Sequence, residues 1–318
     1  MGAYIIWYNI IPLRYGGNVF SDGLTRLTFI MLISLSTPVG IHHEFMEPGI
    51  SPVWKMLHTV TTYGVAIPSF ITAFAIFASF ELAAIARGRR GFIATVKELP
   101  WNDPTFSGAG LGMLLFILGG FGGLVNASYS IDTVVHNTIW IVGHFHVTVG
   151  GPVALTFLGA AYWLIPRVTG RALWKPELAL FQTRLWFFGM LIMSFSMHFA
   201  GLLGAPRRTA DVAYMGAAAA NAWQPLMLLA AAGGFFLFIS ILAFVAVAIG
   251  TLVQNVKTEP MEVTFATPAD GASATPQPLQ HIYRWGVLAL VLAVLAYAGP
   301  FGELLRHPGY LAPGMRTW

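Results

Sequence analysis

Two pairs of histidines are the most chemically informative residues in this chain of 318 residues. His144 and His146 belong to the string GHFH, which lies inside a long apolar stretch. Two positions along a helix correspond to a rotation of about 200°, so the two side chains point to opposite faces. They cannot easily share one metal, but a helix can offer imidazole to two metals, one on each side, on the order of 15 Å apart. Neutral imidazole is a common haem ligand. Two core histidines bonded to their neighbours are the alternative.

The second pair, His42 and His43, lies in STPVGIHHEF at the end of another apolar stretch. Adjacent helical side chains do not face each other, so two neighbouring histidines on one metal need a helix end or a distorted turn. Pro38 and Gly40 provide the means for such a turn. Two nitrogen ligands suit copper or zinc, with a third ligand expected from elsewhere. A solvated histidine pair at the membrane interface is the competing interpretation.

Polar residues in two other places extend the candidate site. One set consists of Asp132, His136, Arg207 and Arg208, expected on the same side of the membrane as both histidine pairs. An arginine pair binds carboxylates well, and haem has two propionates, although loop arginines also serve to set topology.

Hydroxyl groups recur at helical spacing in two apolar stretches. Tyr4 and Tyr8 are four residues apart, and Ser69 and Thr72 are three apart. Such hydroxyls can relay protons with waters between them, or simply hydrogen-bond between helices. Of the other histidines, we expect structural roles for His58 and His198, and we assign none to the loop residues.

The composition excludes most soluble classes of protein. Charged residues make up 9% of the chain and hydrophobic residues 56%, with a mean hydropathy of +0.69. Soluble domains carry about 25% charged residues, so this chain can be neither a cytosolic enzyme nor disordered. The net charge of +4 is small and scattered, which argues against nucleic acid as a partner. Cysteine is absent, which excludes disulfides and thiolate metal sites.

A bilayer is crossed by about 20 apolar helical residues, so the expected fold is an all-α, polytopic transmembrane helix bundle embedded in membrane lipid. Seven stretches qualify as full spans: 25–41, 53–86, 107–130, 136–165, 178–204, 222–254 and 284–305. Alternating these spans places 12 of the 17 basic residues on one side, which is therefore cytoplasmic, with the C-terminus outside. Residues 257–281 then form a cytoplasmic loop.

The apolar segment 1–13 would rise only about 20 Å as a helix, which is too short to cross the membrane. Because a terminal charge in the bilayer is costly, we expect residues 1–318 to be one membrane domain that is the C-terminal part of a larger protein, or one half of a split one.

Four strings together carry a family resemblance: STPVGIHHEF, HNTIWIVGHFHV, YWLIPRVTG and GAPRR. In order and spacing the chain resembles subunit I of the haem–copper oxygen reductases, most of all the B-family of bacterial and archaeal terminal oxidases. The resemblance implies that the chain is the C-terminal portion of a core of twelve or more helices, in a prokaryotic plasma membrane.

The resemblance implies a role for each candidate residue. His42 and His43 match two of the three copper (CuB) ligands, His144 matches the ligand of the high-spin haem where oxygen binds, and His146 matches one ligand of the low-spin haem. Four further residues match a propionate-side cluster linked to proton exit: Asp132, His136, Arg207 and Arg208. The hydroxyl residues match the single proton-uptake path of the B-family: Tyr4, Tyr8, Ser69 and Thr72. This second match favours a proton relay over simple hydrogen bonding between helices.

The chain also departs from the family's pattern. The family's third copper histidine, its cross-linked tyrosine and its second low-spin haem histidine would lie before Met1. The implied partners are the N-terminal part of subunit I, a subunit II with its own copper site, and a cytochrome c-type electron donor.

The expected activity is the reduction of O2 to water with electrons from cytochrome c, coupled to proton uptake and to pumping, with the chain inactive alone. The alternatives are a nitric oxide reductase-like enzyme with non-haem iron, a non-catalytic membrane haem protein or histidine-based transporter, and an inert fragment.

Overall fold

A computed structural model describes residues 1–46, 49–211, 213–258 and 263–306, and in these ranges the protein is a helical bundle without β-strands. Within the described ranges, six helices are long and apolar enough to cross a membrane. They are α3 (Pro52–Ala86), α5 (Pro104–Ala127), the continuous stretch Ile139–Thr169, α9 (Pro176–Leu202), α10 (Gln224–Val253) and α12 (Ile282–Arg306). The expected all-α membrane bundle is confirmed.

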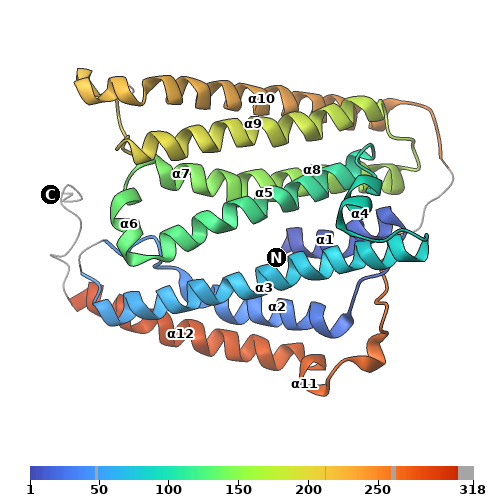
Figure 1. Cartoon of the computed structure of the whole chain (residues 1–318), viewed down its shortest axis with the longest axis horizontal. Coiled ribbons are helices and arrows are strands. Elements are labelled where there is room, and N and C mark those ends of the chain that lie inside the picture. The colour runs from blue at the N-terminus through green and yellow to red at the C-terminus, as the bar shows by residue number, and fades with distance from the viewer. Residues whose placement is uncertain (47–48, 212, 259–262, 307–318) are drawn as a thin grey trace.

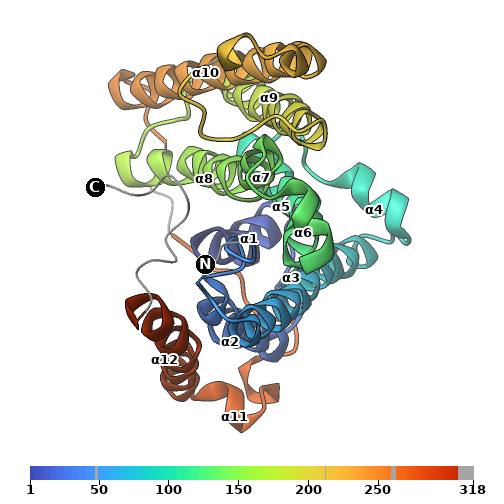
Figure 2. The same ribbon diagram turned by 90° about the vertical axis from the view of Figure 1, so that its left-hand side faces the viewer.

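The long helices run side by side, with α9 and α10 at one edge and α12 at the other (Figure 1). The segment expected as a short helix over 1–13 is α1 (Gly2–Tyr15), which ends at Gly16 in a left-handed conformation. Seen end-on, α1 lies in the middle of the bundle (Figure 2), and it contacts α3, α5 and α8. Most of its residues are buried, so this short helix is a core element that brings Tyr4 and Tyr8 into the interior.

One predicted span is shorter than expected. Residues 25–41 were expected to cross the membrane, but α2 (Asp22–Ser36) has 15 residues and is followed by the 3₁₀ turn η1 (Thr37–Val39). The reason is local, because Pro38 takes a non-helical conformation with φ −88° and ψ 27°. The helix thus stops before the paired histidines, which follow in a turn rather than in the span.

The predicted fourth span, 136–165, is also divided. It begins three residues later, as α7 (Ile139–Phe145), passes through a π-helical segment, η2 (His146–Gly150), and continues as α8 (Gly151–Thr169). Asn137, just before it, has a positive φ of 58°, which a helix does not allow. π-Helical turns inside helices are rare and occur frequently at functional sites.

Glycines allow α5 and α8 to approach closely. Gly108 and Gly112 have the GxxxG spacing on α5. A Cβ placed on Gly108 would lie 2.6 Å from the Cα of Gly159 in α8, so the two backbones are in contact. Small residues at such a seam are typical of membrane helix packing, where van der Waals contact replaces the hydrophobic effect.

We therefore expect Gly108→Val to destabilise the bundle by about 2–3 kcal/mol, the upper range for overpacking, because neither backbone can move aside cheaply. The measurement is the denaturation midpoint of the purified protein in detergent. Gly286→Val in α12 is the control, since a Cβ at Gly286 meets nothing within 4 Å. Equal midpoints for both variants would contradict the close seam.

The ends of the helices agree with the predicted alternation of sides. At one end, the Arg14 guanidinium pairs with Asp103 and Arg184 donates to Asn102 (3.1 Å). At the opposite end, Arg207 donates to the Asn137 side chain (2.8 Å). Segments expected on a common side therefore lie at a common end of the bundle. The predicted outer C-terminus, with His307, falls outside the described residues.

The predicted loop 257–281, of which 259–262 are outside the described residues, packs against the start of α2. The Val19 N–H donates to the Thr267 carbonyl (2.9 Å), and the Ala269 N–H donates to the Val19 carbonyl (2.8 Å). The segment also contains the 3₁₀ turn η5 (Ala272–Ala274) and the short helix α11 (Gln277–Gln280). It is thus more ordered than its composition predicts.

Asp270 makes this packing dependent on pH. Hydrogen bonds from the Ser21 side chain and from the Asp22 N–H (3.1 Å) lower the pKa of Asp270 below its usual 3.8. A lowered folded-state pKa stabilises the packed loop above the unfolded value, and this contribution is lost as the pH falls through the folded pKa. Hydrogen exchange at Val19 and Ala269, corrected for the intrinsic rate, should therefore accelerate below pH 3.8, and Asp270→Asn should abolish this dependence. A dependence that persists in Asp270→Asn would assign it to another group.

Candidate metal centre and proton track

The turn after η1 holds the two adjacent histidines together. The His42 and His43 rings have centroids 4.1 Å apart and are inclined by 82°. The His42 N–H donates to the Val39 carbonyl (3.0 Å), and His42 Nδ1 contacts the Thr62 hydroxyl of α3 (3.1 Å). The two rings lie together in this turn, and their binding of one metal remains a prediction.

His144, at the end of α7, is 5% exposed and faces the same region. Its ring stacks on Trp140 at 6.0 Å between centroids, and its Nδ1 contacts the Thr148 hydroxyl (3.1 Å). A Cβ on Gly122 of α5 would lie 2.5 Å from that nitrogen, so the ring fits only because the facing residue is glycine. The centroids of His43 and His144 are 6.2 Å apart.

His146 lies in different surroundings. It begins the π-helical segment and is half-buried, and its Nδ1 contacts the Val142 carbonyl of its own helix (2.7 Å). Its ring has no described contact with the rings of His43 or His144, whereas these two contact each other. The placement of His144 and His146 on opposite faces remains a prediction.

A cavity of about 230 Å³ lies between η1, α3, α5 and α7. His42 and His144 line it together with three hydroxyl residues, Thr62, Ser69 and Thr148. The rest of the wall is apolar: Val39, Val65, Ala66, Phe70, Ala73, Phe116, Ile117, Gly120, Phe121, Gly123 and Leu124. A cavity that is mostly apolar, with a few converging nitrogen and oxygen atoms, is the usual form of a cofactor site.

The donor atoms are imidazole nitrogens, which are ligands of the kind that haem and copper bind. His43 Nδ1 is buried without a hydrogen-bond partner among the described residues, as expected of a nitrogen that binds a metal. At 6.2 Å, however, the His43 and His144 rings leave room for one metal at most, because each metal–nitrogen bond is about 2 Å. A haem on His144 and a copper on His43 therefore cannot both lie between these two rings as they stand. The described residues contain no cluster of three or more His, Cys, Asp or Glu that could hold a metal.

Three of the four predicted propionate-side residues assemble at one end of the bundle. The Asp132 carboxylate is fully buried and lies 3.2 Å from His136 Nδ1. Arg207 donates from its guanidinium to Asn137, and the Ile139 N–H donates to the Ala205 carbonyl (2.8 Å), which ties this loop to the start of α7. Arg208 is exposed and has a positive φ of 58°. The structure thus brings Asp132, His136 and Arg207 to the end of the helix that carries His144.

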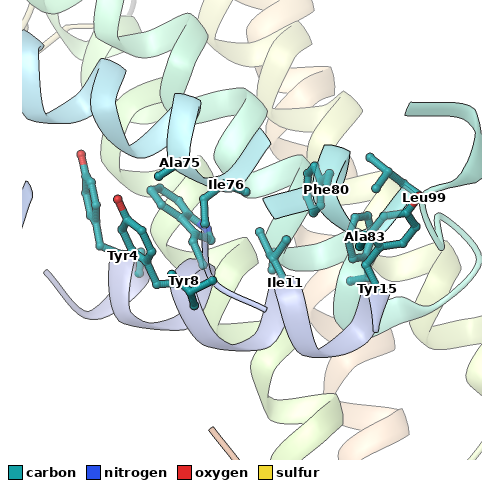
Figure 3. Close-up of a cluster of buried hydrophobic side chains, with 14 of the residues drawn as sticks. Tyr4, Tyr8, Ile11, Tyr15, Ala75, Ile76, Phe80, Ala83 and Leu99 are labelled. Carbon is teal, nitrogen blue, oxygen red and sulfur yellow. The ribbon is translucent and has the colours of Figure 1, made fainter. Parts of the chain in front are cut away.

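The four predicted track residues also meet. The Tyr4 hydroxyl is 3.2 Å from the Ser69 hydroxyl, and the Tyr8 hydroxyl donates to that of Thr72 (3.4 Å). Figure 3 shows Tyr4 and Tyr8 on one face of α1, in the buried cluster that also contains Ala75 and Ile76 of α3. Because Ser69 also lines the cavity, the Tyr4–Ser69 pair borders the candidate metal site, while a path through all four hydroxyls remains a prediction.

Sequence reasoning missed one member of this group. Tyr8 also lies 3.4 Å from the hydroxyl of Thr28, a fully buried residue of α2. Thr25 and Thr28 have the same three-residue spacing as Ser69 and Thr72, which was the available signal. His198 and His58, expected to be structural, are indeed hydrogen-bonded to protein atoms. His281 is in a loop, as expected.

Comparisons with known proteins agree with this fold and site. The family profile described as "Cytochrome C and Quinol oxidase polypeptide I" matches residues 1–236. Cytochrome c oxidase subunit 1 of Thermus thermophilus is 41% identical over 324 aligned residues, which cover 99% of this chain and 57% of the relative. A second Thermus thermophilus sequence of the same name is 48% identical over 108 residues, covering 33% of this chain.

A solved structure of a haem–copper terminal oxidase dimer has a TM-score of 0.87 and 35% identity, covering 94% of this chain and 54% of that one. The chain therefore spans about half the length of the first Thermus relative and of this oxidase, whereas it covers the whole of the second, shorter Thermus sequence. Fold and site together define a multi-pass membrane protein with a histidine-lined cavity inside its helix bundle. The chain belongs to the cytochrome c and quinol oxidase polypeptide I family, which confirms the resemblance found in the sequence.

Proposed function

We propose that this chain forms the greater part of the oxygen-reducing centre of a terminal oxidase, which reduces O2 to water with electrons from cytochrome c. The observation that carries the proposal is the shared cavity, into which His42 and His144 both project from separate elements. Membership of the oxidase family supports it, since haem and copper are the cofactors that this family name and the haem–copper neighbour imply.

Each haem and the copper ion would be held by particular histidines of this chain. His144 would hold the high-spin haem, His42 and His43 would hold copper (CuB), and His146 would hold the low-spin haem. Bound there, haem and copper would supply electron transfer and O2 chemistry. The missing copper ligand and the second ligand of the low-spin haem would come from the N-terminal part of subunit I, so the chain alone would be inactive.

This chain's own residues would orient the metal ligands, face the haem propionates and deliver protons to the site. Trp140 and Thr148 fix the ring of His144, as partners around a metal ligand commonly do. Asp132, His136, Arg207 and Arg208 would face the haem propionates, where an arginine can pair with a carboxylate. Tyr8, Thr72, Tyr4 and Ser69 would pass protons toward the cavity, with waters between the hydroxyls.

The proposed setting is a prokaryotic plasma membrane, crossed several times, with the C-terminus outside. The proposed partners are a subunit II with its own copper site, a cytochrome c-type donor and membrane lipid. Proton pumping would accompany proton uptake.

The test is a reduced-minus-oxidised spectrum, with and without carbon monoxide, together with metal analysis of the assembled membrane protein. We expect one high-spin haem that binds carbon monoxide, one low-spin haem and one copper. Non-haem iron in place of copper would point to a nitric oxide reductase-like enzyme, and absence of the carbon monoxide-binding haem would point to a non-catalytic haem protein.

A further inference from the structure

Helix α12 is peripheral, yet it contacts the turn that carries the paired histidines. It lies at one edge of the bundle (Figures 1 and 2), and only Ala289, Ala296 and Pro300 are buried. None of its residues lines the cavity. Its described contacts are nevertheless with α2, α3 and the η1 turn, and through Trp285 with Pro278 of α11, so it packs directly beside residues 37–39.

The η1 turn leaves backbone groups without helical partners. The last carbonyls of a helix have no intrahelical donor, and Pro38 breaks the continuation. At membrane depth such groups must be satisfied by protein atoms, because water is absent. The conformation of residues 37–41 therefore depends on which side chains reach them.

Tyr297 of α12 satisfies two of these groups. Its hydroxyl donates to the Thr37 carbonyl (2.9 Å) and accepts from the Gly40 N–H (2.6 Å). One phenol thus spans the Pro38 kink from both sides. The contact is so close that a Cβ on Gly40 would overlap the Tyr297 hydroxyl, which explains why a glycine stands there.

His58 of α3 uses both ring nitrogens in the same place. It is fully buried, and its Nε2 lies 3.1 Å from the Ala296 carbonyl of α12, while Nδ1 accepts from the Ile41 N–H (3.4 Å). This pattern corresponds to the neutral ring with its proton on Nε2. Its ring also packs edge-on to that of Tyr297, with centroids 5.4 Å apart.

The outer end of α12 is anchored separately. Glu303 accepts from the Trp54 indole N–H (3.0 Å) and from the Ser51 N–H (2.7 Å), at the start of α3. These bonds hold α12 against α3 without involving the turn, so Tyr297 and His58 can be removed while α12 stays docked.

We propose that His58 and Tyr297 are positioning residues for the copper site, which hold the turn so that His42 and His43 present both imidazoles to the metal. The inference rests on the proposed function, since it assumes that copper binds there. Neither residue reaches the metal; each acts through the backbone at residues 37–41, immediately before His42. Helix α12 is then required for copper binding although it contributes no ligand.

The experiment measures copper per low-spin haem in the assembled oxidase, by mass spectrometry of metals and by the low-spin haem spectrum. The variants are Tyr297→Phe, which removes only the hydroxyl, and His58→Leu. The control is Tyr283→Phe, on the same helix but 67% exposed. Partners around metal ligands commonly contribute 10–100-fold in affinity, so we expect copper retention under a chelator to weaken about 10-fold in both variants.

A conservative change separates hydrogen bonding from packing. His58→Gln keeps an N–H donor for the Ala296 carbonyl and should retain more copper than His58→Leu. The copper-edge absorption spectrum should shift in Tyr297→Phe and stay unchanged in Tyr283→Phe. If His58→Gln retains no more copper than His58→Leu, His58 only fills space and its part of the proposal is overturned.

Two results would overturn the whole inference. One is full copper with unchanged spectra in both Tyr297→Phe and His58→Leu. The other is loss of copper only in parallel with low-spin haem, which would show general misfolding. Absence of copper from the unmodified protein would instead contradict the proposed function, so the two failures are distinguishable.

Discussion

His144→Ala is expected to abolish the carbon monoxide-binding haem signal while part of the low-spin haem signal survives, and His146→Ala is expected to do the reverse. The reason is that the two imidazoles occupy different surroundings although they are two residues apart. His144 lines the cavity and contacts Trp140 and Thr148, whereas His146 begins the π-helical segment and bonds to the carbonyl of Val142.

Reduced-minus-oxidised spectra, with and without carbon monoxide, measure both haems in one sample. His281→Ala is the matched control, because this loop histidine has no proposed ligand role and its substitution should leave both signals intact. Equal loss of both signals from His144→Ala and from His146→Ala would show that the pair supports folding rather than two separate haems.

The fold could largely be predicted from the sequence because each long apolar run has few alternatives to a membrane helix. The predicted spans 53–86 and 222–254 differ from α3 and α10 by at most two residues at each end. Span 25–41 was too long because apolarity continues through Pro38, whereas helical geometry does not. Hydropathy reports burial in lipid, but where a helix ends depends on local backbone conformation.

The candidate site was predictable where it depends on residue type and spacing. Histidine pairs inside apolar segments are costly unless they bind something, so GHFH and HH were recognisable without coordinates. Tyr297 was not, because an isolated hydroxyl at a helical position is common, and Thr28 had only its three-residue spacing from Thr25 as a signal. Their meaning comes from contacts over long separations in sequence: Thr28 with Tyr8, and Tyr297 with Thr37 and Gly40.

The relative placement of two side chains was also beyond prediction from the sequence. The sequence predicted metals on opposite faces of the helix, but it could not predict that the His43 and His144 rings would lie 6.2 Å apart. Side-chain torsions respond to whatever fills the space, and the cavity between these residues is lined mostly by apolar atoms. Backbone placement is therefore the part of the site that follows from the sequence.

Thr72→Val is expected to slow proton-coupled turnover about tenfold while both haems remain, which corresponds to about 1.4 kcal/mol in the barrier. The Thr72 hydroxyl accepts from Tyr8 (3.4 Å) and donates to the Pro68 carbonyl (2.9 Å), so valine removes the Tyr8–Thr72 link between α1 and α3 at nearly constant volume. A lost hydrogen bond of about 0.5–1.5 kcal/mol is of the size required. Oxygen consumption with an artificial donor measures turnover, and the haem spectrum measures assembly.

The control for this variant is Thr183→Val, because Thr183 is also fully buried but its hydroxyl donates only to Leu180, within α9. It should leave turnover unchanged. Since Tyr8 also contacts Thr28, the double variant Thr28→Val with Thr72→Val should slow turnover more than either single change, as Tyr8 then loses both described partners. Unchanged turnover in Thr72→Val would remove Thr72 from the path, and equal slowing in Thr183→Val would attribute the effect to packing.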